Sequence, residues 1–119
     1  MLTNKDYCDY ETCVALRELG YNAPQRLIPD YFGVFDEPQY DERIHLYDAQ
    51  KWLREEKKID VLIELETKDI HLSSKYYSIH ISYMSRFRRE FKSMLKNFDS
   101  YEEALSEGIK EAVKILKEK

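Results

Sequence analysis

Hydrophobic and polar residues alternate along two stretches near the middle of the chain. From Ile59 to Glu66 and from Tyr77 to Tyr83, every second side chain is apolar, which is the period of a strand with one buried face. Because only a polar loop separates these stretches, we expect them to pair as an antiparallel hairpin. A slip of one residue would turn one apolar set to water, so the register should be firm. The expected opposite pairs are Val61 with Ile81, Ile63 with Ile79, and Leu65 with Tyr77.

Apolar residues recur at intervals of three and four on both sides of this hairpin, which predicts helices. The first helix should run over about residues 5–19. The second should begin near His45 or Leu46 and end by Lys58. It carries Trp52, the only tryptophan, which at this spacing is typical of a core anchor and not of a ligand platform.

Specific residues mark two helix ends. Gly20 follows the first helix, at the place where a left-handed C-terminal cap is needed. Ser100 and Glu103 have the spacing of a capping box, and they open a last helix with an unbroken apolar face. Gly108 lies within that face. Since glycine costs roughly 1 kcal/mol of helix propensity, we expect it to serve a close approach to the sheet.

Residues 85–98 are expected to form a further amphipathic helix. Large apolar residues are spaced by three or four positions along this segment, and basic residues fall between them. A helix would turn the basic residues to solvent and bury the apolar set. That set consists of Phe87, Phe91, Met94, Leu95 and Phe98.

The segment between the first two helices has a different character. Residues 25–35 are rich in strand-forming side chains, but Pro29 and Gly33 interrupt them, so we expect one irregular edge strand. Residues 36–42 hold four acidic residues and no basic one, and they should form a loop.

Together these patterns predict a single α+β domain over residues 1–119. It would contain an antiparallel β-hairpin, or a small antiparallel sheet of two to three strands, covered by about four helices. The strand order stays open, as does the role of Ile70 and Leu72 in the hairpin loop. The expected core comprises Trp52, Leu53, Val61, Ile63, Ile79, Ile81, Leu105, Ile109 and Val113.

The composition of the chain argues against several classes of protein. A hydrophobic content of 43% over 119 residues is that of an ordinary globular protein, and a formal net charge of −4 disfavours a general nucleic-acid binder. Apolar runs are too short to span a membrane, and the first residues lack the apolar core of a signal peptide, so we expect a cytoplasmic protein without a membrane partner. Cys8 and Cys13 match no zinc or redox spacing. On one helix they would lie about 140° apart, on different faces.

Three stretches carry a combination of motifs. They are Leu16-Arg-Glu-Leu-Gly20, Leu46-Tyr-Asp-Ala-Gln-Lys-Trp-Leu-Arg-Glu55, and Phe98-Asp-Ser-Tyr-Glu-Glu-Ala-Leu105 with Gly108-Ile-Lys-Glu-Ala112. In these the chain resembles a family of small uncharacterised proteins of bacterial prophages and other mobile elements. That family has an "LxxLGF" helix end, a "QKWLRE" helix, a hairpin and a final "FxSYEEALExGIxEALKL" helix. Tyr21 stands where its phenylalanine is usual. The resemblance implies a bacterial cytoplasmic setting, and the family has no established activity to carry over.

A catalytic interpretation rests on Glu64, Glu66 and His80, which the expected register brings to the polar face of the hairpin, with Asp69 and His71 in the loop. A carboxylate and an imidazole there would shuttle a proton or bind a metal. The alternation already turns these side chains to water, and no fixed-spacing motif accompanies them. We therefore expect no catalytic residues, no metal site and no cofactor.

Two binding functions remain. Small proteins with segregated acidic and basic segments suit a protein interface, either with another protein or in a homodimer, and we rank this non-catalytic accessory role first. Nucleic-acid binding through phosphate contacts ranks second. Both hypotheses use the same candidate binding residues, which are Arg86, Arg88, Arg89, Lys92 and Lys96.

Overall fold

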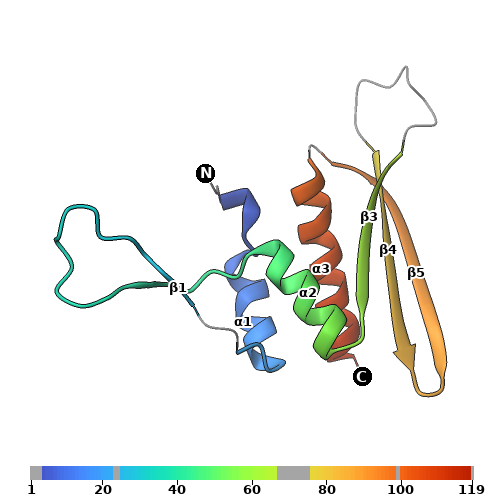
Figure 1. The fold of residues 1–119 in the computed structure, drawn as a ribbon. Coiled ribbons are helices and arrows are strands. Elements are labelled where there is room, and N and C mark those ends of the chain that lie inside the picture. Colours follow the sequence, from blue (N-terminus) through green and yellow to red (C-terminus); the bar gives the residue numbers. More distant parts are fainter. Residues whose placement is uncertain (1–3, 23–24, 67–75, 99, 119) are drawn as a thin grey trace.

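The computed structural model describes residues 4–22, 25–66, 76–98 and 100–118, and in these ranges the chain is an α+β domain. Three α-helices lie on the same side of a three-stranded antiparallel sheet, where the second and third pack on the sheet and the first packs on the third (Figure 1). The helices are α1 (Tyr10–Glu18), α2 (Leu46–Glu56) and α3 (Tyr101–Lys117), and a 3₁₀ turn, η1 (Asn4–Asp6), precedes them. The sheet has the order β3 (Asp60–Glu66), β4 (Tyr76–Ser85), β5 (Arg88–Asn97). A separate two-stranded ribbon consists of β1 (Arg26–Leu27) and β2 (Tyr40–Asp41).

The hairpin of β3 and β4 has the register that its alternation predicts. Val61 lies opposite Ile81, and the two following apolar pairs also match. The physical reason is that a slip by one residue would turn one of the two apolar sets away from the helices. Ile70 and Leu72, whose role the sequence left open, lie outside the described residues.

The predicted helix over residues 85–98 is wrong, because this segment is strand β5. All ten of its residues pair with β4, and a two-residue turn at Arg86 and Phe87 connects the strands. The apolar residues predicted to be inward are therefore outward: Phe87 is 100% exposed, Phe91 74% and Leu95 61%. Strand pairing decides the outcome here, since strand preference depends on neighbouring strands more than on the local sequence. The described chain accordingly has three α-helices instead of about four.

Helix α3 is the centre of the fold. It packs on β3, β4, α1 and α2, and ion pairs connect it to β5. Its approach to the sheet is closest at Gly108, where an added Cβ would lie 2.7 Å from Cγ1 of Val61. The expected reason for a glycine in this helix is thereby confirmed.

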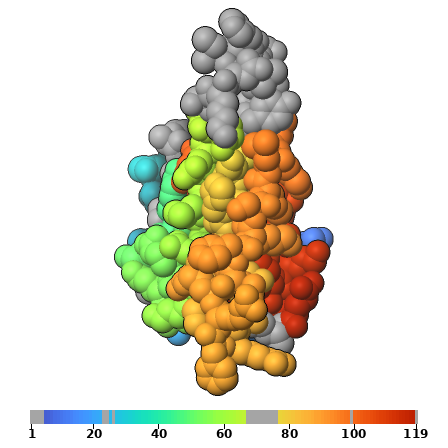
Figure 2. Space-filling view, turned by 90° about the vertical axis from the view of Figure 1, so that its right-hand side faces the viewer, coloured from blue at the N-terminus to red at the C-terminus, as the bar shows by residue number. Residues whose placement is uncertain are grey.

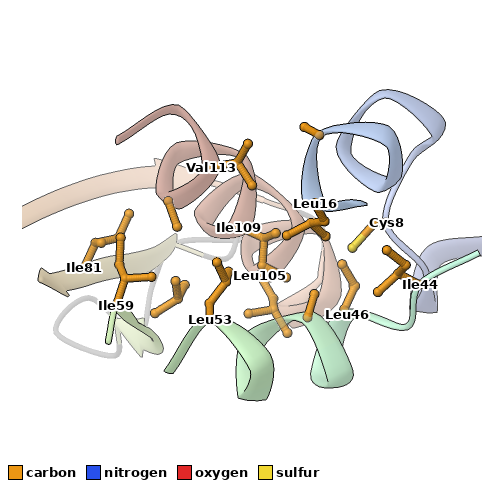
Figure 3. Packing of buried hydrophobic residues seen from close by; sticks show 14 of the residues in the cluster. Cys8, Leu16, Ile44, Leu46, Leu53, Ile59, Ile81, Leu105, Ile109 and Val113 are labelled. Atoms are coloured by element: carbon orange, nitrogen blue, oxygen red, sulfur yellow. The ribbon is translucent and has the colours of Figure 1, made fainter. Parts of the chain in front are cut away.

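The core lies between the sheet and the helices (Figure 3). Seven of the nine residues expected there are buried, and Trp52 and Ile63 are partly buried against the same cluster. Trp52 packs edge to face on Tyr21, with ring centroids 5.4 Å apart. The segment around Cys8 and Ile44 closes the cluster beyond α1 and α2.

Helix ends follow their sequence signals, with one exception. Ser100 Oγ accepts the backbone N–H of Glu103, and Gly20 takes φ 109° after α1. The first helix begins later than expected, at Tyr10, because the Asp9 carboxylate accepts the N–H of Thr12 and caps it there. Cys8 therefore lies outside the helix, and its N–H donates to the carbonyl of Ile44.

The irregular strand and acidic loop form a long arm, defined here as residues 25–41. β1 and β2 pair at its base, and the rest projects away from the helices on the side opposite the sheet (Figure 1). Residues 27–40 are all exposed. The predicted strand over residues 25–35 is wrong beyond Leu27, and the predicted loop over residues 36–42 contains strand β2. The sequence also did not indicate that these segments leave the domain together.

Candidate interaction surface

Within the described residues, all helices lie on one side of the sheet, and its other face has no helix over it. Figure 2 looks onto this face and shows β3, β4 and β5 side by side. We call it the open face. Its apolar side chains are Leu62, Phe91 and Leu95, each more than half exposed. Met84 lies near its end. Between them lie the polar side chains of His80, Ser82 and Ser93. The open face is thus a mixed apolar and polar surface, as the whole area of many protein interfaces is.

The five candidate basic residues divide between the two faces of the sheet. On the helix side, Lys92 forms an ion pair with Glu111 of α3, and Lys96 Nζ lies 3.8 Å from Glu107 Oε1. Alternation along β5 places Arg89 on the opposite, open face, where it donates to Ser82 Oγ. The structure thus brings together Arg86, Arg88 and Arg89, and separates Lys92 and Lys96 from them.

These three arginines and Phe87 occupy the turn between β4 and β5, which we call the basic tip. Arg86 takes a left-handed backbone conformation with φ 58°, a position that glycine or asparagine fills in most two-residue hairpin turns. Phe87 at its apex is fully exposed. The Arg88 side chain is also exposed, and its Nε lies 3.9 Å from Glu90. A costly backbone conformation that holds cations and an aromatic ring in solvent is typical of a functional site.

The acidic end of the open face contains the residues of the catalytic hypothesis. His80 Nε2 lies 3.8 Å from Glu64 Oε2, His80 Nδ1 lies 3.0 Å from Ser93 Oγ, and Glu66 accepts a hydrogen bond from Ser78. The register thus gathers Glu64, Glu66 and His80 as expected.

This gathering lacks the features of a catalytic centre. The Glu64 and His80 side chains are 66% and 40% exposed on a flat sheet, where backbone N–H groups are engaged in strand pairing and not aimed at a substrate. Among the described residues, no three His, Cys, Asp or Glu side chains are grouped to hold a metal ion. Asp69 and His71 lie outside these ranges.

A groove of about 690 Å³ opens elsewhere, between η1, α1, the segment before α2 and the first half of α3. Its lining includes Cys8 and Cys13, and basic and acidic residues are equally numerous along it. Lys110 and Asp9 neutralise each other across it at 2.9 Å. The groove therefore has no charge preference that would select a ligand class.

The two cysteines do share a neighbourhood, contrary to the expectation from helix geometry. Because Cys8 precedes α1, both thiols point into the core side of the groove and are buried. A hydrogen bond from Cys8 lowers the pKa of Cys13 to about 6, with help from the Ile44 backbone and from Arg17. The same hydrogen bond raises the pKa of Cys8.

Sequence reasoning missed the arm as an exposed surface. Tyr31 and Phe32 are 85% and 88% exposed at its end, and Val34 is exposed beside them. A signal was present, because strand-forming residues around a proline and a glycine, followed by an acidic run, are unusual for a buried strand.

None of the helices in the described ranges is both long and apolar enough to cross a bilayer. The chain matches no protein-family model, no curated protein and no solved structure.

Proposed function

We propose that this chain is a small, non-catalytic accessory protein that binds another protein through the open face and the basic tip. The observation that carries the proposal is that Phe91, exposed on the open face, lies two residues along β5 from Arg89, while Leu62 and Leu95 are exposed elsewhere on the same face. Aromatic residues and arginine are enriched in protein interfaces. Arginines at the rim would also accelerate the encounter with an acidic partner.

The biological setting belongs to the same proposal. Three motif-bearing stretches resemble small proteins of bacterial mobile elements, which supports a bacterial cytoplasmic location. Proteins of this size without a catalytic signature act most simply by binding another macromolecule, so the accessory role requires no chemistry that the chain lacks.

Single-stranded nucleic acid is the second candidate ligand of this surface. The observation in its favour is the basic tip itself, where Phe87 stands fully exposed between arginines, with Phe91 on the adjoining face. Aromatic rings would stack on bases while the guanidinium groups contact phosphates. The formal net charge of −4 and the carboxylates Glu64 and Glu66 at the other end of the face weigh against this ligand.

Affinity capture from a bacterial lysate tests the proposal, with two variants matched in charge. One variant carries Arg86→Gln and Arg89→Gln, which removes two cations from the tip. The control carries Lys92→Gln and Lys96→Gln, which removes two cations that face α3. We expect the tip variant to lose the captured proteins, increasingly at low salt, and the control to retain them.

Three results would contradict the proposal or change the ligand. Equal capture by the tip variant and wild type at every salt concentration would exclude the tip as a docking surface. Equal loss in both variants would mean that total charge matters and not the location of the basic residues. Binding of mixed-sequence single-stranded oligonucleotides that weakens steeply with salt, and is lost only in the tip variant, would assign the surface to nucleic acid.

A further inference from the structure

We propose that the arm of one copy docks on the open face of a second copy, so that the chain assembles head to tail. The inference rests on the proposed function, because it takes the open face to be a docking surface. It adds a specific occupant for that surface, namely the aromatic, acidic arm of the same protein.

The arm exposes a large area of apolar side chains to solvent. Its exposed aromatic side chains are Tyr31, Phe32, Phe35 and Tyr40. Since a large aromatic side chain presents roughly 200 Å², these four expose on the order of 500 Å². That is already comparable with the largest apolar patch of a typical monomeric protein, roughly 300–600 Å². Leu27 and Val34 add to it.

Local hydrogen bonds hold the end of the arm in shape. The two carboxylate oxygens of Asp30 accept the backbone N–H groups of Val34 and Phe35, at 2.9 and 3.0 Å. These backbone hydrogen bonds lower the pKa of Asp30. Gly33 completes the turn with φ 64°. A preformed end loses less conformational freedom on binding than a flexible one, which favours docking.

Charge and polarity on the open face complement those of the arm. Acidic Asp36 and Glu37 are exposed next to the aromatic residues of the arm. On the open face, Arg89 lies two residues along β5 from exposed Phe91, and Arg86 is in the adjoining turn. Docking would bring the aromatic side chains of the arm into contact with the apolar side chains of the open face, and the acidic residues of the arm close to the arginines. Phe87 at the tip and Phe91 on the open face expose roughly 350 Å² of side-chain surface. The contact would therefore be small for a specific interface, and assembly should depend on protein concentration.

The position of the two surfaces determines the type of assembly. The arm projects from one side of the domain, and the open face looks out from the opposite side, with the helices between them (Figure 1). A copy cannot cover its own open face with its own arm. The contact is therefore between different surfaces of two copies, which gives a ring or an open chain and not a two-fold dimer.

Complementation between two variants tests this arrangement. The arm variant carries Tyr31→Ser and Phe32→Ser, and the face variant carries Phe91→Thr and Leu95→Thr. All four positions are exposed, so both variants should fold, which circular dichroism checks. Analytical ultracentrifugation should show the mass of wild type increasing with concentration, while each variant alone stays a monomer. An equimolar mixture should form a two-chain species and nothing larger, since one intact arm meets one intact face.

Other outcomes would overturn the inference. Wild type that remains monomeric at millimolar concentration excludes self-assembly. An arm variant that still associates like wild type shows that the contact does not use the arm. Variants that fail to combine in the mixture show that arm and face do not bind each other.

Failure of the proposed function is distinguishable from these outcomes. The arm variant keeps an intact open face and should still capture the lysate partner, whereas the face variant should lose it. If both variants retain the partner, the proposed function is wrong whatever the assembly shows. Charge supplies an independent check, because Asp36→Lys with Glu37→Lys should block assembly. Mixing this variant with Arg86→Glu, Arg89→Glu chains should restore assembly beyond two chains, since each arm then meets a face of opposite charge.

Discussion

Replacing Gly108 with alanine tests how closely α3 must approach the sheet. A Cβ at this position would lie 2.7 Å from Val61 Cγ1 and 3.2 Å from Ile79 Cγ2. Carbon atoms in favourable contact are roughly 3.5–4.0 Å apart, so the nearer methyl group is too close by about 1 Å. Val61 is fully buried, and its branched side chain is stiff, so it cannot rotate away. The helix and the strand must therefore separate locally.

Two opposing contributions determine how much Gly108→Ala changes the free energy of unfolding. Overpacking of this kind costs about 1–3 kcal/mol. Alanine in place of glycine in a helix interior recovers about 1 kcal/mol. We expect Gly108→Ala to lower the free energy of unfolding by up to about 2 kcal/mol. For a domain of this size that corresponds to a melting midpoint lower by up to roughly 8 °C.

Urea denaturation of four proteins checks the reasoning: wild type, Gly108→Ala, Val61→Ala and the double variant. If the clash with Val61 is the cause, Gly108→Ala in the Val61→Ala background should be neutral or stabilising, because only the helix propensity remains. The same cost in both backgrounds would show that Val61 is not the obstacle. A Gly108→Ala protein at least as stable as wild type would refute the close approach itself.

Three further predictions concern single residues. Ser100→Ala should lower the free energy of unfolding by about 1 kcal/mol through the lost N-cap, measured by urea denaturation, and an unchanged midpoint would exclude that role. Arg86→Gly should leave the midpoint unchanged or raise it, since glycine adopts φ 58° without the cost of roughly 1 kcal/mol that other residues meet; a lower midpoint would contradict this. The alkylation rate of Cys13 should rise with pH through about 6 and level off above it, because its thiolate forms there, whereas an ordinary thiol continues to gain reactivity towards pH 9. Mass spectrometry should find Cys8 modified more slowly, since its pKa is raised.

Much of the fold follows from patterns that depend only on neighbouring residues. The register of β3 on β4 follows from alternation, because only one pairing buries both apolar sets. The caps at Gly20 and Ser100 follow from backbone geometry that few residues satisfy. In the same way, Gly108 in an otherwise apolar helix face indicated the close packing that the structure has.

The sequence alone indicated only part of the candidate binding surface. The basic residues of segment 85–98 could be named from the sequence, but the spacing of the apolar residues around them favours a helix, and Arg86 gives no turn signal. Pairing with β4 made the segment a strand, so Lys92 and Lys96 turned to α3 while Arg89 turned to the open face.

By itself, then, the sequence determined the α+β class, the hairpin register and the helix caps, because burial of each apolar face and the backbone conformation at each cap are local requirements. The tertiary structure alone decided that β5 joins the sheet, that the open face carries no helix, and that the arm leaves the domain. Each of these depends on which distant backbone supplies hydrogen bonds and which surface is already covered, and no window of neighbouring residues contains that information.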